Sequence, residues 1–162
     1  MSVSRIPMTQ ENYEKQQDEL GKLQALLREV TEKVAEARAE GDLKENAEYH
    51  AQRERQGQVQ AKIDLVQDRL ARAQIIDPSE LPDGTVVFGS RVTIKDVETG
   101  EEEIYELVGP GDEDYENNRI LTSSPRGQAL LGKKIGDIAE VQAPRRTFRY
   151  EVLDIVQSFG AD

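Results

Sequence analysis

Two heptad repeats of apolar residues, with Glu40-Gly41-Asp42 between them, limit the folds available to this 162-residue chain. Apolar residues recur at alternating steps of three and four in each repeat, which places them on one face of a helix and is typical of a coiled coil. The repeats are Leu20, Leu23, Leu27, Val30, Val34, Ala37 and then Val59, Ile63, Val66, Leu70, Ala73. Gly41 follows the first repeat, where helices commonly end on glycine. We therefore predict two antiparallel helices joined by a short loop, the first of them capped by Thr9.

The second half of the chain has a different composition, with frequent Gly, Pro and Thr. Pro78, Pro82 and the pair Asp83-Gly84 favour turns, so we predict a hairpin over residues 1–76, a linker over 77–84 and a second domain over 85–162. The expected strands are Thr85–Phe88, Arg91–Val97, Glu103–Val108, Arg119–Leu121, Ile138–Val141 and Thr147–Ile155. The one expected helix spans Ser124–Leu131, and we expect Ser124 to cap it poorly. The predicted fold class is α+β, with a coiled-coil hairpin followed by a small antiparallel sheet and one helix.

Composition excludes several classes of function. The net charge of −11 argues against binding to bulk duplex nucleic acid, because phosphate neutralisation requires an excess of basic residues. The chain has no cysteine and one histidine, which excludes disulfide scaffolds, thiolate zinc sites and multi-histidine metal sites. No stretch approaches the roughly 20 apolar residues that span a bilayer, and the N-terminus lacks a secretory signal. We expect a cytoplasmic protein without membrane contact.

The turn between the predicted helices carries two acidic residues, Asp42 and Glu45, and allows two interpretations. The spacing D-x-x-E at a helix start is typical of a capping box, and on spacing alone this structural role is the favoured one. Alternatively, residues three apart on a helix are close enough to bind one divalent cation together. Two carboxylates alone would hold Mg²⁺ weakly, because that ion keeps an octahedral shell of oxygen ligands. The two roles do not exclude each other.

A longer motif around these acids resembles a known family. The stretch Gly41-Asp42-Leu43-Lys44-Glu45-Asn46-Ala47-Glu48-Tyr49-His50 is similar to the tip motif of the bacterial Gre family of transcript cleavage factors. Other stretches resemble the family in order along nearly the whole chain. They are Ile6–Thr9, Gln74–Asp77 (the end of the family's second helix), Val87–Val92, Ser124-Pro125 and Leu130–Asp137.

This resemblance implies a coiled-coil hairpin with an active tip at residues 38–53, followed by an FKBP-like domain that docks on RNA polymerase. The hairpin would enter the secondary channel of the polymerase and bring Asp42 and Glu45 to its active site. There they would complete the binding of a shared Mg²⁺ and stimulate hydrolytic cleavage of backtracked RNA. The chain itself would then be a monomeric activator that binds no cofactor tightly, rather than an enzyme.

The same resemblance makes Arg38 and Arg53 the core of a basic patch that contacts the extruded RNA 3′ end. Solvated helix arginines are an equally good explanation of these two residues. For Tyr49 we favour packing against the first helix over stacking on RNA, and for His50 we expect a structural role. The second domain has few aromatic residues, so we expect no proline isomerase activity from it.

Two other functions remain open at this point. A relative of the same architecture could bind the channel and inhibit the polymerase, although the acidic pair of Asp42 and Glu45 argues against this alternative. A coiled-coil chaperone or adaptor that works without polymerase is the alternative from a different class.

Overall fold

The computed structural model describes residues 4–41 and 46–157. The chain divides into two compact units, each discontinuous in sequence. One unit comprises Met1–Arg5 and Tyr13–Ala73, and the other comprises Ile6–Asn12 and Gln74–Asp162. Within the described residues, no helix is both long enough and apolar enough to cross a membrane.

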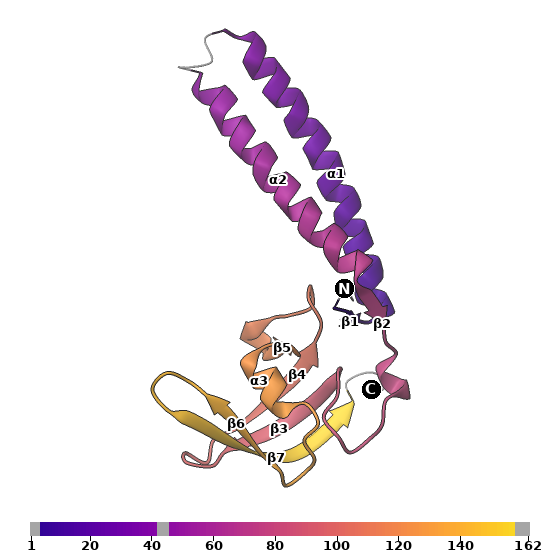
Figure 1. Cartoon of the computed structure of the whole chain (residues 1–162), viewed down its shortest axis with the longest axis vertical. Coiled ribbons are helices and arrows are strands. Elements are labelled where there is room, and N and C mark those ends of the chain that lie inside the picture. Colours follow the sequence, from indigo (N-terminus) through magenta and orange to yellow (C-terminus); the bar gives the residue numbers. More distant parts are fainter. Residues whose placement is uncertain (1–3, 42–45, 158–162) are drawn as a thin grey trace. The chain divides into compact units, whose positions relative to one another are not determined.

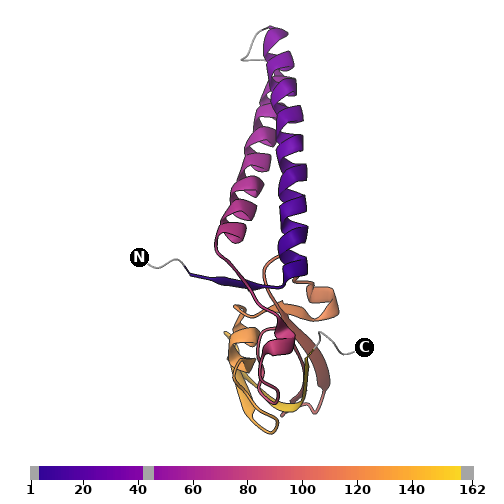
Figure 2. The same cartoon turned by 90° about the vertical axis from the view of Figure 1, so that its right-hand side faces the viewer.

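The first unit is an antiparallel pair of long helices, α1 (Gln10–Ala39) and α2 (Ala47–Ala71), which lie side by side in both views (Figures 1 and 2). The predicted cap of α1 is confirmed, since the backbone N–H of Asn12 donates to Thr9 Oγ1 at 3.1 Å. Their facing side is the predicted heptad seam. Residues of both repeats are buried there: Val30, Val34 and Ala37 from α1, and Val59, Ile63 and Val66 from α2. The predicted coiled-coil hairpin is therefore confirmed.

Helix α2 ends earlier than its heptad pattern predicts. The backbone N–H of Arg72 caps the helix by donating to the carbonyls of Asp68 and Leu70. The Arg72 guanidinium also pairs with Asp68 at 2.9 Å and donates to the Ser4 carbonyl at 2.8 Å. The chain then becomes the short strand β2 (Ala73–Ile75), so the resemblance of this segment to a helix end is wrong as a structural prediction.

Strand β2 pairs with β1 (Ile6–Met8) in a two-stranded sheet. Beyond the strands, the backbone N–H of Ile76 donates to the Met8 carbonyl at 2.9 Å, and Met8 itself is fully buried. The amide Nδ2 of Asn12 donates to the Pro110 carbonyl at 3.0 Å. These contacts explain why Ile6–Asn12 belongs to the second unit although its last residues lie in the first turn of α1.

The second unit contains a five-stranded sheet in the order β5-β4-β3-β7-β6, whose strands are labelled in Figure 1. Its strands are β3 (Ser90–Asp96), β4 (Glu102–Val108), β5 (Arg119–Leu121), β6 (Ile138–Gln142) and β7 (Thr147–Gln157). Five of the six predicted strands are confirmed. The predicted strand Thr85–Phe88 is wrong, because Thr85 forms only an isolated bridge with Lys134. The sheet is also not wholly antiparallel, since β5 pairs with β4 in parallel.

Helix α3 (Pro125–Leu130) packs on this sheet through the fully buried side chain of Leu130. The expectation of a poor helix start is wrong. Ser124 is the N-cap and its Oγ accepts from the backbone N–H of Gly127 at 3.0 Å. Pro125 occupies the first helical position, where its missing N–H costs no hydrogen bond and its fixed φ suits a helix. Two short 3₁₀ turns, Pro78–Glu80 and Tyr115–Asn117, complete the unit.

Candidate functional site

The ends of α1 and α2 bracket the candidate tip. Helix α1 ends at Ala39, and Gly41 has a φ of 128°, a positive value that glycine adopts without strain, as predicted for this position. The two predicted catalytic and metal-binding residues, Asp42 and Glu45, lie outside the described residues. Their placement at the tip and their role stay predictions.

The N-cap of α2 is Asn46, and the prediction that Asp42 caps this helix is wrong. Helix α2 begins at Ala47, and the side chain of Asn46 accepts from the backbone N–H of Tyr49 at 3.0 Å. An N-cap side chain satisfies one of the donors that the first helical turn leaves unpaired. A capping box formed by Asp42 and Glu45 therefore does not open this helix.

A cluster of aromatic and basic side chains lies next to the tip. Arg38 of α1 donates from Nη2 to the Tyr49 hydroxyl at 3.5 Å, and its Cζ lies 5.7 Å from the centre of the Tyr49 ring. Tyr49 is half-buried and makes an edge contact with His50, with ring centres 5.5 Å apart. The predicted packing of Tyr49 toward the first helix is confirmed by these contacts.

The two predicted basic-patch residues, Arg38 and Arg53, act on the same tyrosine. The hydrogen bond from Arg38 lowers the pKa of Tyr49; partial burial opposes this shift, and the positive charges of Arg38 and Arg53 add to it. Arg53 donates from Nη1 to Gln56 Oε1 at 3.0 Å. Among the described residues neither arginine forms an ion pair, and both side chains are exposed. Both guanidinium groups are thus accessible to an anion, and contact with RNA stays a prediction.

The described residues do not form a metal site by themselves. Across 4–41 and 46–157, no three or more His, Asp or Glu side chains gather as ligands for an ion. Carboxylates are the donor type that Mg²⁺ takes, so Asp42 and Glu45 fit this ion chemically. Two such ligands would fill only part of an octahedral shell.

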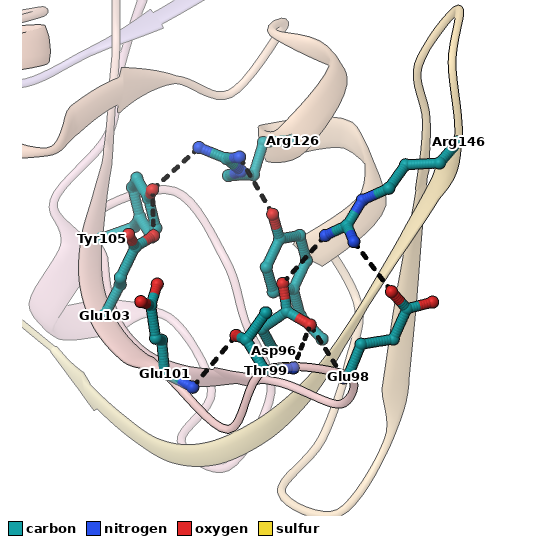
Figure 3. Close-up of polar contacts among 9 residues, drawn as sticks. Asp96, Glu98, Thr99, Glu101, Glu103, Tyr105, Arg126 and Arg146 are labelled. Carbon is teal, nitrogen blue, oxygen red and sulfur yellow. Dashed lines mark hydrogen bonds and ion pairs between the residues drawn. The ribbon is translucent and has the colours of Figure 1, made fainter.

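The sequence did not predict a polar cleft of about 410 Å³ that lies in the second unit (Figure 3). Arg126 reaches from α3 and donates to the hydroxyls of Tyr105 at 2.8 Å and Tyr150 at 3.1 Å. Its Cζ lies 4.9 Å and 5.3 Å from the centres of the same two rings. The guanidinium is therefore held by hydrogen bonds and by cation–π attraction at once.

A second arginine closes another side of this cleft. Arg146 pairs with Asp96 at 3.2 Å and with Glu98 at 2.7 Å, and its Cζ lies 4.0 Å from the centre of the Phe148 ring. The pKa of Asp96 is lowered first by the backbone N–H of Glu98; partial burial opposes this, and the N–H of Thr99 and Arg146 lower it further. Guanidinium groups thus cover the aromatic rings here, and an apolar proline-binding pocket does not fit this surface.

The Tyr105 hydroxyl is the most strongly perturbed group of the cleft. Burial, followed by its hydrogen bond to Glu103, raises the pKa of Tyr105 to about 12, against the opposing charge of Arg126. The phenol is therefore a neutral donor toward Glu103 and a neutral acceptor toward Arg126 across the physiological range. The Tyr105 hydroxyl therefore serves as a hydrogen-bonding link between Glu103 and Arg126.

The fold is that of a two-part protein, a helical hairpin with polar side chains where α1 ends and α2 begins and a sheet unit with a polar cleft. Residues 6–75 match the family described as transcription elongation factor, N-terminal, and residues 81–157 match transcription elongation factor, GreA/GreB, C-terminal. The chain belongs to the GreA/GreB family of transcription elongation factors.

Two named relatives agree with this assignment along 94% of the chain. The transcription elongation factor GreA of Thermodesulfovibrio yellowstonii is 47% identical over 154 residues, covering 94% of this chain and 98% of the relative. The GreA of Methylococcus capsulatus is 45% identical over 155 residues with the same coverage. The solved structure of GreA factor homolog 1 (Gfh1) of Thermus thermophilus is 25% identical with a TM-score of 0.46, covering 94% of this chain and 99% of that one.

Proposed function

We propose that this chain binds bacterial RNA polymerase and stimulates hydrolytic cleavage of the 3′ end of backtracked RNA. Its hairpin would reach the polymerase active site through the secondary channel. The observation that carries the proposal is the match of both halves of the chain to transcription elongation factors of the GreA/GreB family. The capping of α2 by Asn46 supports it further. This cap supplies the structural role that had competed with a chemical role for Asp42 and Glu45, within a motif that resembles the tip of the family.

In this proposal, Asp42 and Glu45 act as metal ligands only jointly with the polymerase. Two-metal sites place ions about 3.5–4 Å apart, where they stabilise the attacking and leaving oxygens of a phosphodiester. The two carboxylates complete the shell of a Mg²⁺ shared with the polymerase and orient the attacking water by accepting its hydrogen bonds. The isolated chain needs no tightly bound cofactor, and it is an activator of the polymerase rather than a nuclease.

Arg38 and Arg53 bind the extruded RNA in the same proposal. Their exposed guanidinium groups lack ion-pair partners among the described residues. A phosphate oxygen offers the bidentate, charge-assisted hydrogen bonds that guanidinium groups form well. Such contacts would hold the RNA 3′ end in register with the water to be activated, even though the chain as a whole is acidic.

The second unit docks on the polymerase in this proposal, and the chain works as a cytoplasmic monomer. Docking and chemistry are then divided between two parts of one chain, since the acidic pair lies between α1 and α2 in sequence and the cleft lies in the sheet unit. Changes at Asp42 and Glu45 would therefore leave the affinity for polymerase nearly unaltered.

The test is a cleavage assay on backtracked elongation complexes that carry end-labelled RNA. We expect the wild-type chain with Mg²⁺ to shorten the RNA, and the chain alone to cut no RNA. Asp42→Ala combined with Glu45→Ala should abolish stimulation while binding to polymerase, measured by co-migration or anisotropy, changes less than about two-fold. Gln60→Ala is the matched control, because the exposed Gln60 side chain of α2 donates from Nε2 to Asp64 Oδ1 on the same helix.

Two results would contradict the proposal. Loss of RNA synthesis without shortened RNA would identify a channel-binding inhibitor of the same architecture. Absence of any effect on the elongation complex would favour a coiled-coil adaptor that works without polymerase.

A further inference from the structure

The side chain of Asn46 connects the two helices at the point where the tip begins. Its Oδ1 accepts from the backbone N–H of Tyr49 at 3.0 Å within α2. Its Nδ2 donates to the carbonyl of Ala37, near the end of α1, at 2.6 Å. One amide group therefore caps α2 and bonds to α1 at the same time, and the residue is half-buried in doing so.

The accepting carbonyl belongs to the last turn of α1. The final four carbonyls of a helix have no partner further along the same helix and need one from elsewhere. The Ala37 carbonyl also accepts from the backbone N–H of Glu40 at 3.2 Å, so both of its lone pairs are used. Asn46, at the start of α2, thus supplies a hydrogen-bond donor to a carbonyl group at the end of α1.

The capping role alone does not explain why residue 46 carries an amide side chain. Ser, Thr and Asp are as good or nearly as good as Asn at an N-cap, because each supplies the oxygen that the helix requires. An amide carries an acceptor and two N–H donors on one planar group, whereas a carboxylate carries acceptors only. The bond to the Ala37 carbonyl therefore requires an N–H donor, which the cap of α2 does not require.

We infer that Asn46 is a positioning residue for the two carboxylates of the tip. It fixes the distance between the point where the chain leaves α1 and the point where it enters α2. Asp42 and Glu45 lie between these points in sequence, and Glu45 is bonded directly to Asn46. Displacing a catalytic group by about 1 Å can reduce a rate about 100-fold, so a looser connection would lower cleavage without removing any ligand. This inference rests on the proposed function.

A second contact between the helix ends is weaker. The Arg38 to Tyr49 hydrogen bond measures 3.5 Å and is exposed to solvent, where water competes for both groups. It involves flexible side chains at both ends, whereas the Asn46 contact joins a short side chain to backbone atoms on both helices. The backbone path into the tip is thus set by Asn46.

The experiment separates the bond to α1 from the cap with two variants, Asn46→Asp and Asn46→Ser. Both keep a capping oxygen and lose the Nδ2 donor, and only the aspartate adds charge. Cleavage of the RNA in backtracked elongation complexes is measured under single-turnover conditions over a range of concentrations of each variant chain. This yields the maximal rate and the half-saturating concentration separately. Circular dichroism at 222 nm reports the helix content, and Gln60→Ala is again the control.

For both variants we expect unchanged helix content and a half-saturating concentration within two-fold of wild type. The maximal rate should fall about ten-fold or more, while Gln60→Ala keeps the wild-type rate. The inference is overturned if either variant cleaves within two-fold of wild type, if the half-saturating concentration rises in step with the loss of rate, or if helix content falls. A loss confined to Asn46→Asp would be an effect of charge. Failure of the proposed function would show differently, as a wild-type chain that stimulates no cleavage.

Discussion

Replacing the acidic pair of the tip should leave the hairpin as stable as before, whereas replacing Asn46 should destabilise it. An N-cap residue changed to alanine costs about 0.5–2 kcal/mol. Asn46→Ala also removes the 2.6 Å bond to the Ala37 carbonyl, and a hydrogen bond of this kind contributes about 1 kcal/mol net. Asn46→Ala should therefore lower the free energy of unfolding by about 2 kcal/mol.

Asp42→Ala combined with Glu45→Ala should change the free energy of unfolding by less than about 0.5 kcal/mol. The cap of α2 remains in place, because Asn46 supplies it. The two carboxylates precede the N-terminus of α2, where negative charge is favourable, and follow the C-terminus of α1, where it is unfavourable. These two electrostatic effects oppose each other, so little net change remains.

Urea unfolding followed at 222 nm measures both variants, since most of the helical signal comes from α1 and α2. For a domain of this size the free energy falls by about 1–3 kcal/mol per molar urea. Asn46→Ala should then move the midpoint down by roughly 1 M, and the acidic double variant by no more than about 0.25 M. A double variant that unfolds as early as Asn46→Ala would refute the reasoning, because the carboxylates would then be structural caps and their cleavage defect a consequence of instability.

Three further predictions concern the two units. In the sheet unit the pKa of Tyr105 rises from 10.0 to about 12 on folding. The contribution of the protonated phenol to the free energy of unfolding is therefore complete below pH 10 and is lost as the pH rises through 12. Tyr105→Phe should remove this pH dependence, worth about 1–2 kcal/mol after solvent screening, and should remove one late step from the tyrosinate absorbance titration; an unchanged titration would contradict the assignment. In the hairpin, Ile63→Ala should cost about 2–4 kcal/mol in urea unfolding, because Ile63 is 3% exposed, whereas Leu65→Ala, at a 51% exposed position of the same helix, should cost under about 0.5 kcal/mol. Gly127→Ala should destabilise the sheet unit by about 2 kcal/mol or more in thermal unfolding, because the added Cβ would lie 2.3 Å from a carbonyl oxygen, and a neutral result would mean that α3 can shift.

The hairpin could be predicted from sequence because its packing repeats locally. Each heptad position specifies the same face, and residues such as Val30 and Ile63 are buried where the pattern places them. Most strands of the sheet were also predictable, since they are short runs rich in β-formers that Gly, Pro and Asn separate. The parallel pairing of β5 with β4 was not, because partner choice depends on how distant segments meet.

The errors at the ends of α2 have different physical causes. At its start, the residues Asp42 and Asn46 both satisfy the local rules for a cap, and the rules do not decide between two good candidates four positions apart. At its end, Ala73 continues the heptad phase, but the chain there pairs with a strand from the N-terminus instead. Such long-range pairing overrides local helix preference.

The cleft of the sheet unit could not be predicted for a related reason. Tyr105, Arg126 and Tyr150 lie on β4, α3 and β7, and no spacing in the sequence connects them. Each residue taken alone is unremarkable for its element. The fold alone brings a guanidinium between two phenol rings.

The discontinuity of the sheet unit determines how this chain can be divided in the laboratory. A gene fragment that starts in the linker would omit Ile6–Asn12, and so would lack both strands of the β1–β2 sheet and the Asn12 amide that bonds to Pro110. Such a fragment would expose backbone groups and lose the buried Met8. An autonomous version should instead replace the excised helices with a short glycine-rich bridge between residues 12 and 74, so that both pieces of the module stay on one polypeptide.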